Sequence, residues 1–171
     1  MTSTLEVLDG GQPITFSFED ILKYHGPRAP GGVAHAFKVL ERALPLLDPD
    51  GPCERREIVV ETAFGGPGAR DAFEMVTRAV TGDRFHIDPS LARPERGRAL
   101  ERFVFRLGYR DRGALLVLRE GFVTDEFIDL ARTEERTAEQ ERRLDAMKQE
   151  MADRVMGPPG GEVYDVEGAV R

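Results

Sequence analysis

Cysteine is nearly absent from the sequence and histidine is scarce, since the 171 residues contain one cysteine and three histidines. A single cysteine excludes a disulfide within the chain and a metal cluster held by several thiolates of one chain. This cysteine, Cys53, follows residues 48–52, whose aspartates, prolines and glycine predict a surface loop. The chain therefore offers few of the soft ligands that zinc and redox centres use.

Long hydrophobic runs are also missing, because no stretch approaches the roughly 20 apolar residues of a membrane-spanning helix. The first residues show no basic segment followed by an apolar run, which is the pattern of a secretion signal. The net charge of −7 argues against nucleic acid or an anionic membrane as the main partner. We therefore expect a cytoplasmic protein without a nucleic-acid or membrane partner.

What the sequence does contain is typical of a globular chain. Hydrophobic residues make up 40% and charged residues 32% of a length that suits one core. Apolar periodicity, capping signals and turn residues predict the elements. In chain order we expect a small hairpin at 5–16, a short helix at 17–24, a helix at 32–44 that Pro45 ends or kinks, a strand at 57–62, a helix at 70–80, strands at 84–88, 102–109 and 114–118, and a helix at 124–156.

This order predicts an α+β fold in which a helix-strand-helix-three-strand core forms a small mixed sheet covered on one face. We expect the α+β domain to occupy residues 1–120, a long C-terminal helix 121–156 and a tail 157–171. Residues 132–143 of that helix are almost wholly polar and predict a solvated face. A narrow apolar stripe from Leu144 to Val155 then predicts docking against another surface, and a second subunit in a homodimer is one candidate for it.

Two loops that run into helices carry most of the residues suited to chemistry. Residues 24–32 hold a tyrosine, His25, Arg28 and two prolines, and residues 64–68 hold three glycines and a proline before Arg70 and Asp71. Helix N-termini attract anions, and arginine adds a two-pronged donor, so the loops suggest an anion site. The alternative is two ordinary loops, with Asp71 serving only as a helix cap.

The order of motifs resembles the FmdE family, which comprises a component of formylmethanofuran dehydrogenase and its stand-alone relatives, over roughly residues 17–120. Members of that family carry His-Gly-His-x-Cys-Pro-Gly after a short helix, then Cys-x-x-Asp-Ala, then Thr-Gly-Cys-Thr-x-Gly. Here residues 25–31 read His-Gly-Pro-Arg-Ala-Pro-Gly, residues 68–72 read Gly-Ala-Arg-Asp-Ala, and residues 77–82 read Thr-Arg-Ala-Val-Thr-Gly. The resemblance implies the family's scaffold and a cleft between the first two loops.

The resemblance does not carry over the family's metal. Pro27 stands at the second histidine, and the three cysteine positions hold Ala29, Gly68 and Ala79, so only His25 and Asp71 match polar groups. One histidine and one aspartate fall short of the three or four ligands that a zinc or iron site needs. We therefore expect no metal and no other cofactor. The alternative is a metal ion or haem bound by His25 and His35 with further ligands from a second subunit or from solvent.

The leading interpretation is a protein that binds or transforms a small anionic metabolite by acid–base chemistry, as a biosynthetic isomerase, cyclase or lyase without a cofactor. His25 is the acid–base candidate, because histidine titrates near neutral pH. The other candidates are Asp71 and Glu61 as catalytic carboxylates, and Arg28, Arg70, His35 and Tyr24 as ligand contacts. A different class stays open, namely a non-catalytic partner or scaffold subunit whose cleft is empty.

Overall fold

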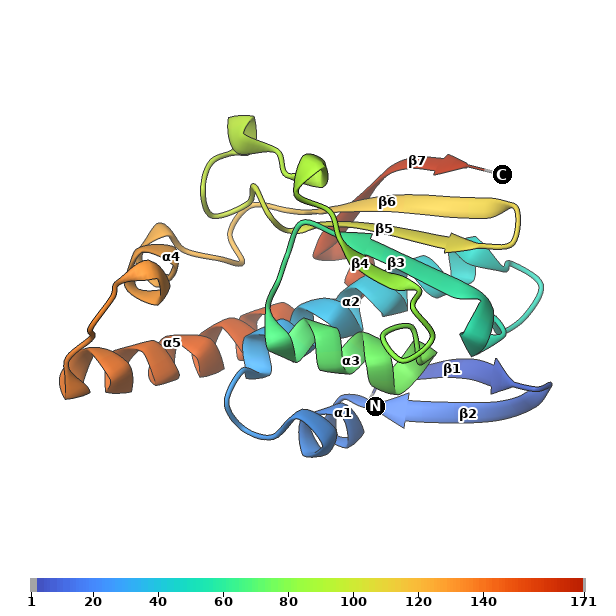
Figure 1. Ribbon diagram of the computed structural model, residues 1–171, viewed down its shortest axis with the longest axis horizontal. Coiled ribbons are helices and arrows are strands. Elements are labelled where there is room, and N and C mark those ends of the chain that lie inside the picture. The colour runs from blue at the N-terminus through green and yellow to red at the C-terminus, as the bar shows by residue number, and fades with distance from the viewer. Residues whose placement is uncertain (1–2, 171) are drawn as a thin grey trace.

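A five-stranded sheet with helices packed on one face forms the centre of the molecule (Figure 1). The computed structural model describes residues 3–170. Its helices and strands are β1 (Thr4–Asp9), β2 (Gln12–Ser17), α1 (Phe18–His25), α2 (Pro30–Leu47), β3 (Ile58–Thr62), α3 (Pro67–Thr77), β4 (Phe85–Ile87), β5 (Val104–Tyr109), β6 (Arg112–Leu118), α4 (Asp125–Arg132), α5 (Ala138–Met156) and β7 (Tyr164–Val170).

The strand order of the large sheet is β4-β3-β5-β6-β7. Strand β4 runs parallel to β3, whereas every other neighbouring pair is antiparallel. The expected α+β class, with its helix-strand-helix-three-strand order and a small mixed sheet, is therefore confirmed. The predicted N-terminal hairpin is also present, as a separate two-stranded sheet of β1 and β2.

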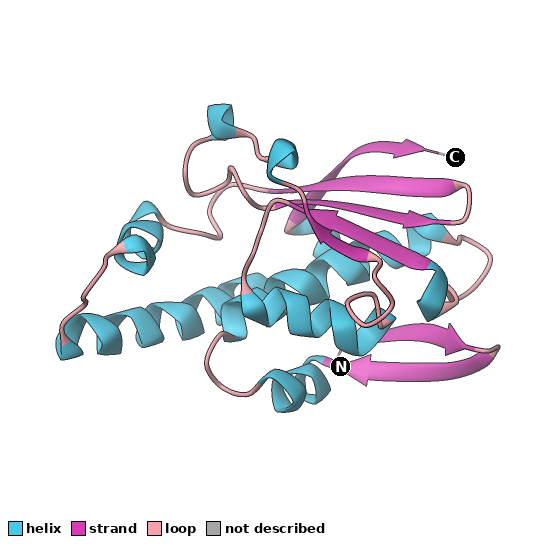
Figure 2. Ribbon diagram, in the orientation of Figure 1, coloured by secondary structure: helices cyan, strands magenta, loops and turns pink. Residues whose placement is uncertain are grey.

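The elements lie in layers, with α2 and α3 between the large sheet and the small hairpin (Figure 2). Alternation along β3 decides which side chains meet the helices: Val60 is buried, whereas Val59 is 36% exposed and points to the other face. The apolar stripe of α2 is buried as its periodicity predicts, and Phe37 is wholly inaccessible. The core therefore fills the space between α2, α3 and one face of the sheet.

The short helix α1 begins and ends where the sequence predicts. The Ser17 hydroxyl accepts the amide of Asp20 at 3.1 Å, and the Asp20 carboxylate accepts the amide of Ser17 at 2.9 Å. This capping box satisfies two amides at the start of the helix. At the other end Gly26 takes a φ of +91°, a conformation that glycine adopts without strain.

Pro45 does not end α2, which continues to Leu47. The proline lies in the last turn, where its missing N–H removes one hydrogen bond, and the buried Leu47 holds the turn against the core. Helix α3 spans Pro67–Thr77 rather than 70–80. Pro67 supplies the preset φ of a first helical position, and the left-handed φ of +57° at Arg78 ends the helix early.

The C-terminal helix is broken in two, contrary to the single helix expected over 124–156. Helix α4 ends at Arg132, and α5 starts anew at Ala138. Between them Glu135 adopts a φ of +53°. The restart has a local cause, because Thr137 and Gln140 form a second capping box that fixes a helix N-terminus at this point.

The apolar stripe of α5 packs within the chain. Leu144, Met147, Met151 and Val155 are all buried, and α5 lies along α2 (Figure 1). The absence of a side chain at Gly31 makes room for the Met151 thioether, whose methyl would lie 2.2 Å from a Cβ there. The predicted docking of the stripe therefore takes place within the chain, and the stripe gives no support to a homodimer.

The expected tail at 157–171 is wrong for the residues that the structure describes. Residues 164–170 form β7, which pairs antiparallel with β6 and extends the sheet. Tyr164, at the start of the strand, is completely buried. Val163, Tyr164 and Val166 are residues that favour strands, and the exposed edge of β6 gave them a partner.

Cys53 is also misplaced by its sequence context, because its side chain is fully buried rather than on a surface loop. The segment that carries it runs beside β1, where the Leu8 amide donates to the Cys53 carbonyl at 2.8 Å. Burial raises the pKa of the Cys53 thiol to about 12, so the thiol stays protonated at neutral pH.

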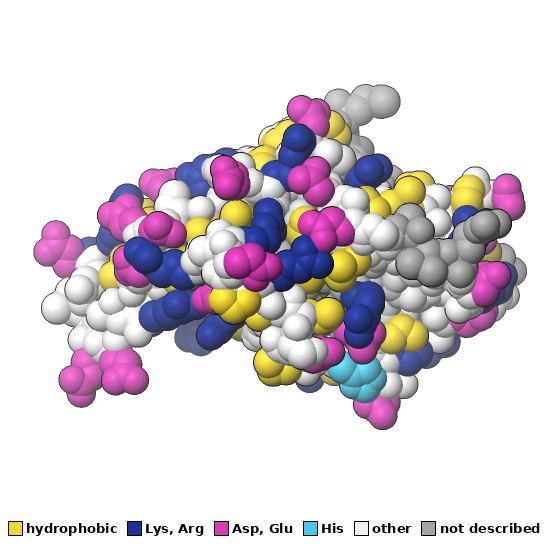
Figure 3. Space-filling model, turned by 90° about the horizontal axis from the view of Figure 1, so that it is seen from above, with side chains coloured by type: hydrophobic (Ala, Val, Ile, Leu, Met, Phe, Trp, Pro, Cys, Tyr) yellow, Lys and Arg dark blue, Asp and Glu magenta, His cyan; other side chains and the backbone are white. Residues whose placement is uncertain are grey.

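The face of the sheet that lies away from α2 and α3 carries basic and acidic side chains in alternation (Figure 3). Hydrophobic side chains lie between them in small patches in this view. One pair on this face is Arg106 and Glu61, from neighbouring strands, with 2.9 Å between Nε and Oε1. None of the described helices is long and apolar enough to cross a membrane.

Candidate functional site

A cavity of about 430 Å³ lies where α2 and α3 begin, and we call it the α2–α3 cavity. Its walls come from five separate parts of the chain. They are Ala29, Gly31 and Gly32 of α2 and its entry; Phe64, Gly65, Gly66, Pro67 and Gly68 before and in α3; Arg98, Arg102 and Phe103 before β5; Phe127, Ile128, Ala131 and Arg132 of α4; and Lys148 and Met151 of α5.

Both helix N-termini at the cavity lack a side-chain cap. The residues before the helices are Ala29 and Gly66, and neither provides an oxygen for the first-turn amides. Pro30 and Pro67 occupy the first helical positions and have no amide to satisfy. The remaining first-turn N–H groups have no intrahelical acceptor, so both ends carry the positive pole of a helix dipole.

Glycine allows these two helix ends to meet. A Cβ on Gly68 would lie 2.5 Å from the carbonyl oxygen of Ala29, and one on Gly32 would lie 3.0 Å from the amide nitrogen of Ala69. Real side chains do not tolerate the first of these distances. Gly32 and Gly68 therefore let the two helix ends approach each other, so that both positive poles lie at one cavity.

Four basic side chains line the same cavity, and its described lining contains no acidic one. Arg98 is already held by the Asp129 carboxylate at 2.9 and 3.0 Å, and Arg132 lies 3.3 Å from Glu101. Arg98 and Asp129 are both exposed, and Arg132 is exposed beside a half-buried Glu101, so these surface pairs contribute little stability.

Arg102 and Lys148 differ from Arg98 and Arg132 in having no carboxylate partner among the described residues. The two cations come from different walls, Arg102 from the segment before β5 and Lys148 from α5. A negatively charged group in the cavity would therefore meet two helix dipoles and two unpaired cations.

The structure brings His25 and Asp71 together, although 46 positions separate them in the chain. The Nδ1 atom of His25 lies 2.8 Å from a carboxylate oxygen of Asp71. The His25 side chain is only 7% exposed, and its Nε2 atom is buried without a hydrogen-bond partner among the described residues. Neither residue lines the α2–α3 cavity. The pair fastens α1 to α3 and so holds the loop 26–29 that leads into the cavity.

The sequence-predicted arginines and Tyr24 lie outside the cavity. Arg28 is exposed, and Arg70 lies 3.9 Å from Asp71 with more than half of its side chain exposed. Tyr24 is 54% exposed and lines a separate hollow between β2, α1 and α3. These three residues therefore do not contribute to the cavity walls.

Glu61 lies on the wrong face of the sheet for the predicted site. Its side chain pairs with Arg106 on the face away from α2 and α3. The alternation of β3 left open which set of side chains faces the helices. The buried face is occupied by Ile58, Val60 and Thr62, so Glu61 points to the other face.

His35 is buried in the core and touches no open part of the cavity. Its Nδ1 lies 2.8 Å from the Tyr164 hydroxyl, and its ring packs at 4.6 Å between centroids against Phe103. Burial lowers the pKa of His35 to about 3 and raises that of Tyr164 well above its usual value. Both groups are therefore neutral at physiological pH.

The metal site of the family that the chain resembles does not fit these residues. Among residues 3–170, no group of three or more histidine, cysteine, aspartate or glutamate side chains is placed to hold a metal ion. The two histidines of the alternative site have different neighbours, Asp71 for His25 and Tyr164 for His35. Each ring uses its Nδ1 atom for that neighbour, and no group of metal-ligating side chains among residues 3–170 includes the two rings.

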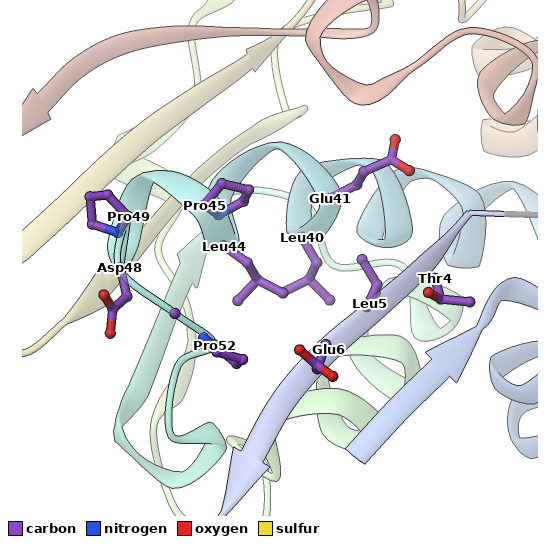
Figure 4. Close-up of a pocket in the computed structure, with 11 residues that line it drawn as sticks. Thr4, Leu5, Glu6, Leu40, Glu41, Leu44, Pro45, Asp48, Pro49 and Pro52 are labelled. Atoms are coloured by element: carbon purple, nitrogen blue, oxygen red, sulfur yellow. The ribbon is translucent and has the colours of Figure 1, made fainter. Parts of the chain in front are cut away.

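A second hollow lies between β1 and α2, where Leu5, Leu40 and Leu44 converge at its floor (Figure 4). Its lining includes the carboxylates of Glu6, Glu41 and Asp48 and no basic side chain among the described residues. Glu41 is already engaged by Lys38 at 2.9 Å and by the amide of Gly160 at 2.8 Å. This hollow therefore has the charge opposite to that of the α2–α3 cavity.

Sequence reasoning missed the residues that give the cavity its chemistry, namely Arg102, Phe103 and Lys148. Arg102 and Phe103 alternate at the start of an expected strand, and Lys148 lies between two buried methionines of α5. No local motif marks them, since only the tertiary fold places them beside the two glycine loops.

Comparison with known proteins adds no relative. No protein-family model matches this chain, and no curated protein matches its sequence.

Proposed function

We propose that this chain binds a small anionic metabolite in the α2–α3 cavity. The observation that carries the proposal is the meeting of two uncapped helix N-termini in a cavity whose described lining has four basic side chains and no acidic one. Such an arrangement favours a carboxylate or a phosphate over a neutral or cationic ligand.

An open cavity supports binding over the scaffold alternative. In a scaffold protein with a collapsed cleft, aromatic side chains would fill the space between the loops. Phe64 instead lines the cavity and stacks on Phe103 at 4.6 Å, and Phe73 lies in the core against Phe85 and Phe105.

Binding also has more support than proton transfer by His25. A histidine oriented by a carboxylate is a common arrangement for a general base. Here, however, the reactive Nε2 is buried and His25 lies outside the cavity lining, so proton transfer would require the loop 26–29 to open. The His25–Asp71 pair is better suited to hold that loop.

We also propose that the chain is a diverged relative of the FmdE family. The support is the hydrogen bond between His25 and Asp71, the two residues that match polar positions of that family's motifs. Superposition on a solved member of that family tests this relation. If the family's motif loops do not superpose on residues 25–31 and 68–72, the chain is not a relative of the family.

Calorimetric titration with simple anions tests the binding proposal. We expect wild-type protein to bind carboxylates or phosphates, and the double variant Arg102→Gln/Lys148→Gln to bind them at least tenfold more weakly. The reason is that hydrogen bonds to charged groups contribute about 1.5–3 kcal/mol each. Raised salt should weaken the wild-type affinity as well.

The matched control is Arg28→Gln/Arg70→Gln, which removes the same charge from exposed positions outside the cavity lining. This control should keep the wild-type affinity. Equal losses in the two double variants would show a general charge effect and would contradict a site at the cavity.

A further inference from the structure

Among the residues that the structure describes, those that line the α2–α3 cavity include no neutral polar side chain. Its seventeen described lining residues are glycines, alanines, a proline, three phenylalanines, an isoleucine, a methionine, three arginines and a lysine. Hydroxyl, amide and carboxylate side chains are absent from this lining. A sugar or an amino acid would therefore bury hydroxyl or amino groups for which the side chains offer no acceptor, at a substantial cost in affinity.

The apolar part of the wall is fixed in place. Phe103 stacks on Phe64 at an angle of 25° on one side and packs against the buried His35 on the other. Met151 is anchored in the space that Gly31 leaves open, and Phe127 and Ile128 close the cavity from α4. Such a surface favours a hydrocarbon or aromatic body.

The volume is larger than a bare inorganic anion needs. About 430 Å³ corresponds to on the order of a dozen water molecules at roughly 30 Å³ each. Cavities of this size are typical of ligands with a body as well as a charged group. An inorganic phosphate would meet the cations and leave the aromatic wall exposed to water.

We propose that the ligand is an amphipathic anion, in which a carboxylate or phosphate monoester head carries a hydrocarbon or aryl body. The head lies with Arg102, Lys148 and the amides of the two helix N-termini, and the body lies against Phe64, Phe103 and Met151. This inference rests on the proposed anion-binding function and specifies its ligand class.

A homologous series of ligands tests it by calorimetry on the full chain. The probes are acetate, butyrate, hexanoate and octanoate, with hexyl phosphate, inorganic phosphate and neutral hexanol. Each methylene buried in an apolar site contributes about 0.8 kcal/mol, so affinity should rise about three- to fourfold per carbon until the cavity is full. Hexyl phosphate should bind much more tightly than inorganic phosphate, and hexanoate more tightly than hexanol.

A cavity-filling variant locates the body of the ligand. Ala131 is exposed on α4 and lines the cavity, so Ala131→Trp should lower the chain length at which affinity stops rising. Ala146→Trp places the same side chain at an exposed position of α5 outside the lining and should leave the series unchanged.

The outcomes separate this inference from the proposed function. If all anions bind equally whatever their chain length, the amphipathic ligand is wrong and a general anion site stands. If hexanol binds as well as hexanoate, the anionic head is wrong, and the proposed function fails with it. Absence of binding throughout the series overturns both, and a rise with chain length that Ala131→Trp does not shorten places the body elsewhere.

Discussion

His35 joins α2 to the last strand of the sheet through a single hydrogen bond. The bond links its Nδ1 to the Tyr164 hydroxyl, and the other ring nitrogen is buried without a partner among the described residues. The charged form of such a ring would have no compensating carboxylate, because its contacts are the aromatic rings of Phe103 and Tyr164. This explains why burial alone lowers the pKa of His35 to about 3.

The lowered pKa predicts acid sensitivity. Above pH 6.5 His35 is neutral in both states, but between pH 6.5 and about 3 only the unfolded chain takes up a proton there. The free energy of unfolding should therefore decrease as the pH is lowered through this window. The contribution of this residue is up to about 1.4 kcal/mol per pH unit. Urea unfolding at several pH values from 7.5 to 5 should show this slope reduced in His35→Gln.

The matched control is His86→Gln, at an exposed position of the edge strand β4. This variant should keep the wild-type slope. If His35→Gln and wild type lost stability in parallel between pH 6.5 and 5, His35 would not be the buried neutral group described above. The comparison uses slopes, because the substitution also changes the bond to Tyr164.

Single residues were predictable where a local motif fixed their position. The family resemblance implied that the loops carrying His25 and Asp71 would converge, and the two side chains lie 2.8 Å apart. Glu61 was not predictable, because a strand presents alternate residues to both faces and its pattern does not say which face is covered. Arg102 and Lys148 carry no local signal at all.

At the scale of elements, the contact between the N-termini of α2 and α3 depends on glycine. Alanine normally favours a helix by up to about 1 kcal/mol over glycine. At Gly68 the added methyl would lie 2.5 Å from the Ala29 carbonyl oxygen and 3.1 Å from the Val33 amide, both of which are backbone atoms. Gly68→Ala should therefore destabilise the protein by about 1–3 kcal/mol, measured by urea or thermal unfolding.

Gly65→Ala is the control for this substitution, since a Cβ there would meet no atom within 4 Å. It should change the free energy of unfolding by less than about 0.5 kcal/mol. A Gly68→Ala protein as stable as wild type would show that the two helix ends are not in contact in solution.

Elements with their own start and stop signals were predictable, and those that depend on a partner were not. The capping box of α1 and the β5–β6 hairpin are local and were correct. The break before α5 was also encoded locally, by Thr137 and Gln140, but the continuous polar pattern concealed it. Strand β7 forms because the edge of β6 is available, which the sequence of the last residues alone does not reveal.

At the scale of the whole molecule, the cavity is a product of chain topology. Segments from residue 29 to residue 151 meet at it, and α5 reaches it because its apolar stripe packs against the core. The sequence predicted the two glycine loops, and the family resemblance implied a cleft between them. It could not predict which cations line the cleft, because those cations come from three other segments.

A two-dimensional ¹H–¹⁵N NMR titration with hexanoate tests the central claim most directly. The account predicts that the amides of Gly31, Gly32 and Gly68 shift first and saturate together, and that Arg102→Gln/Lys148→Gln abolishes these shifts at the same ligand concentration. Shifts centred on the acidic hollow between β1 and α2, or no shifts at all, would contradict it.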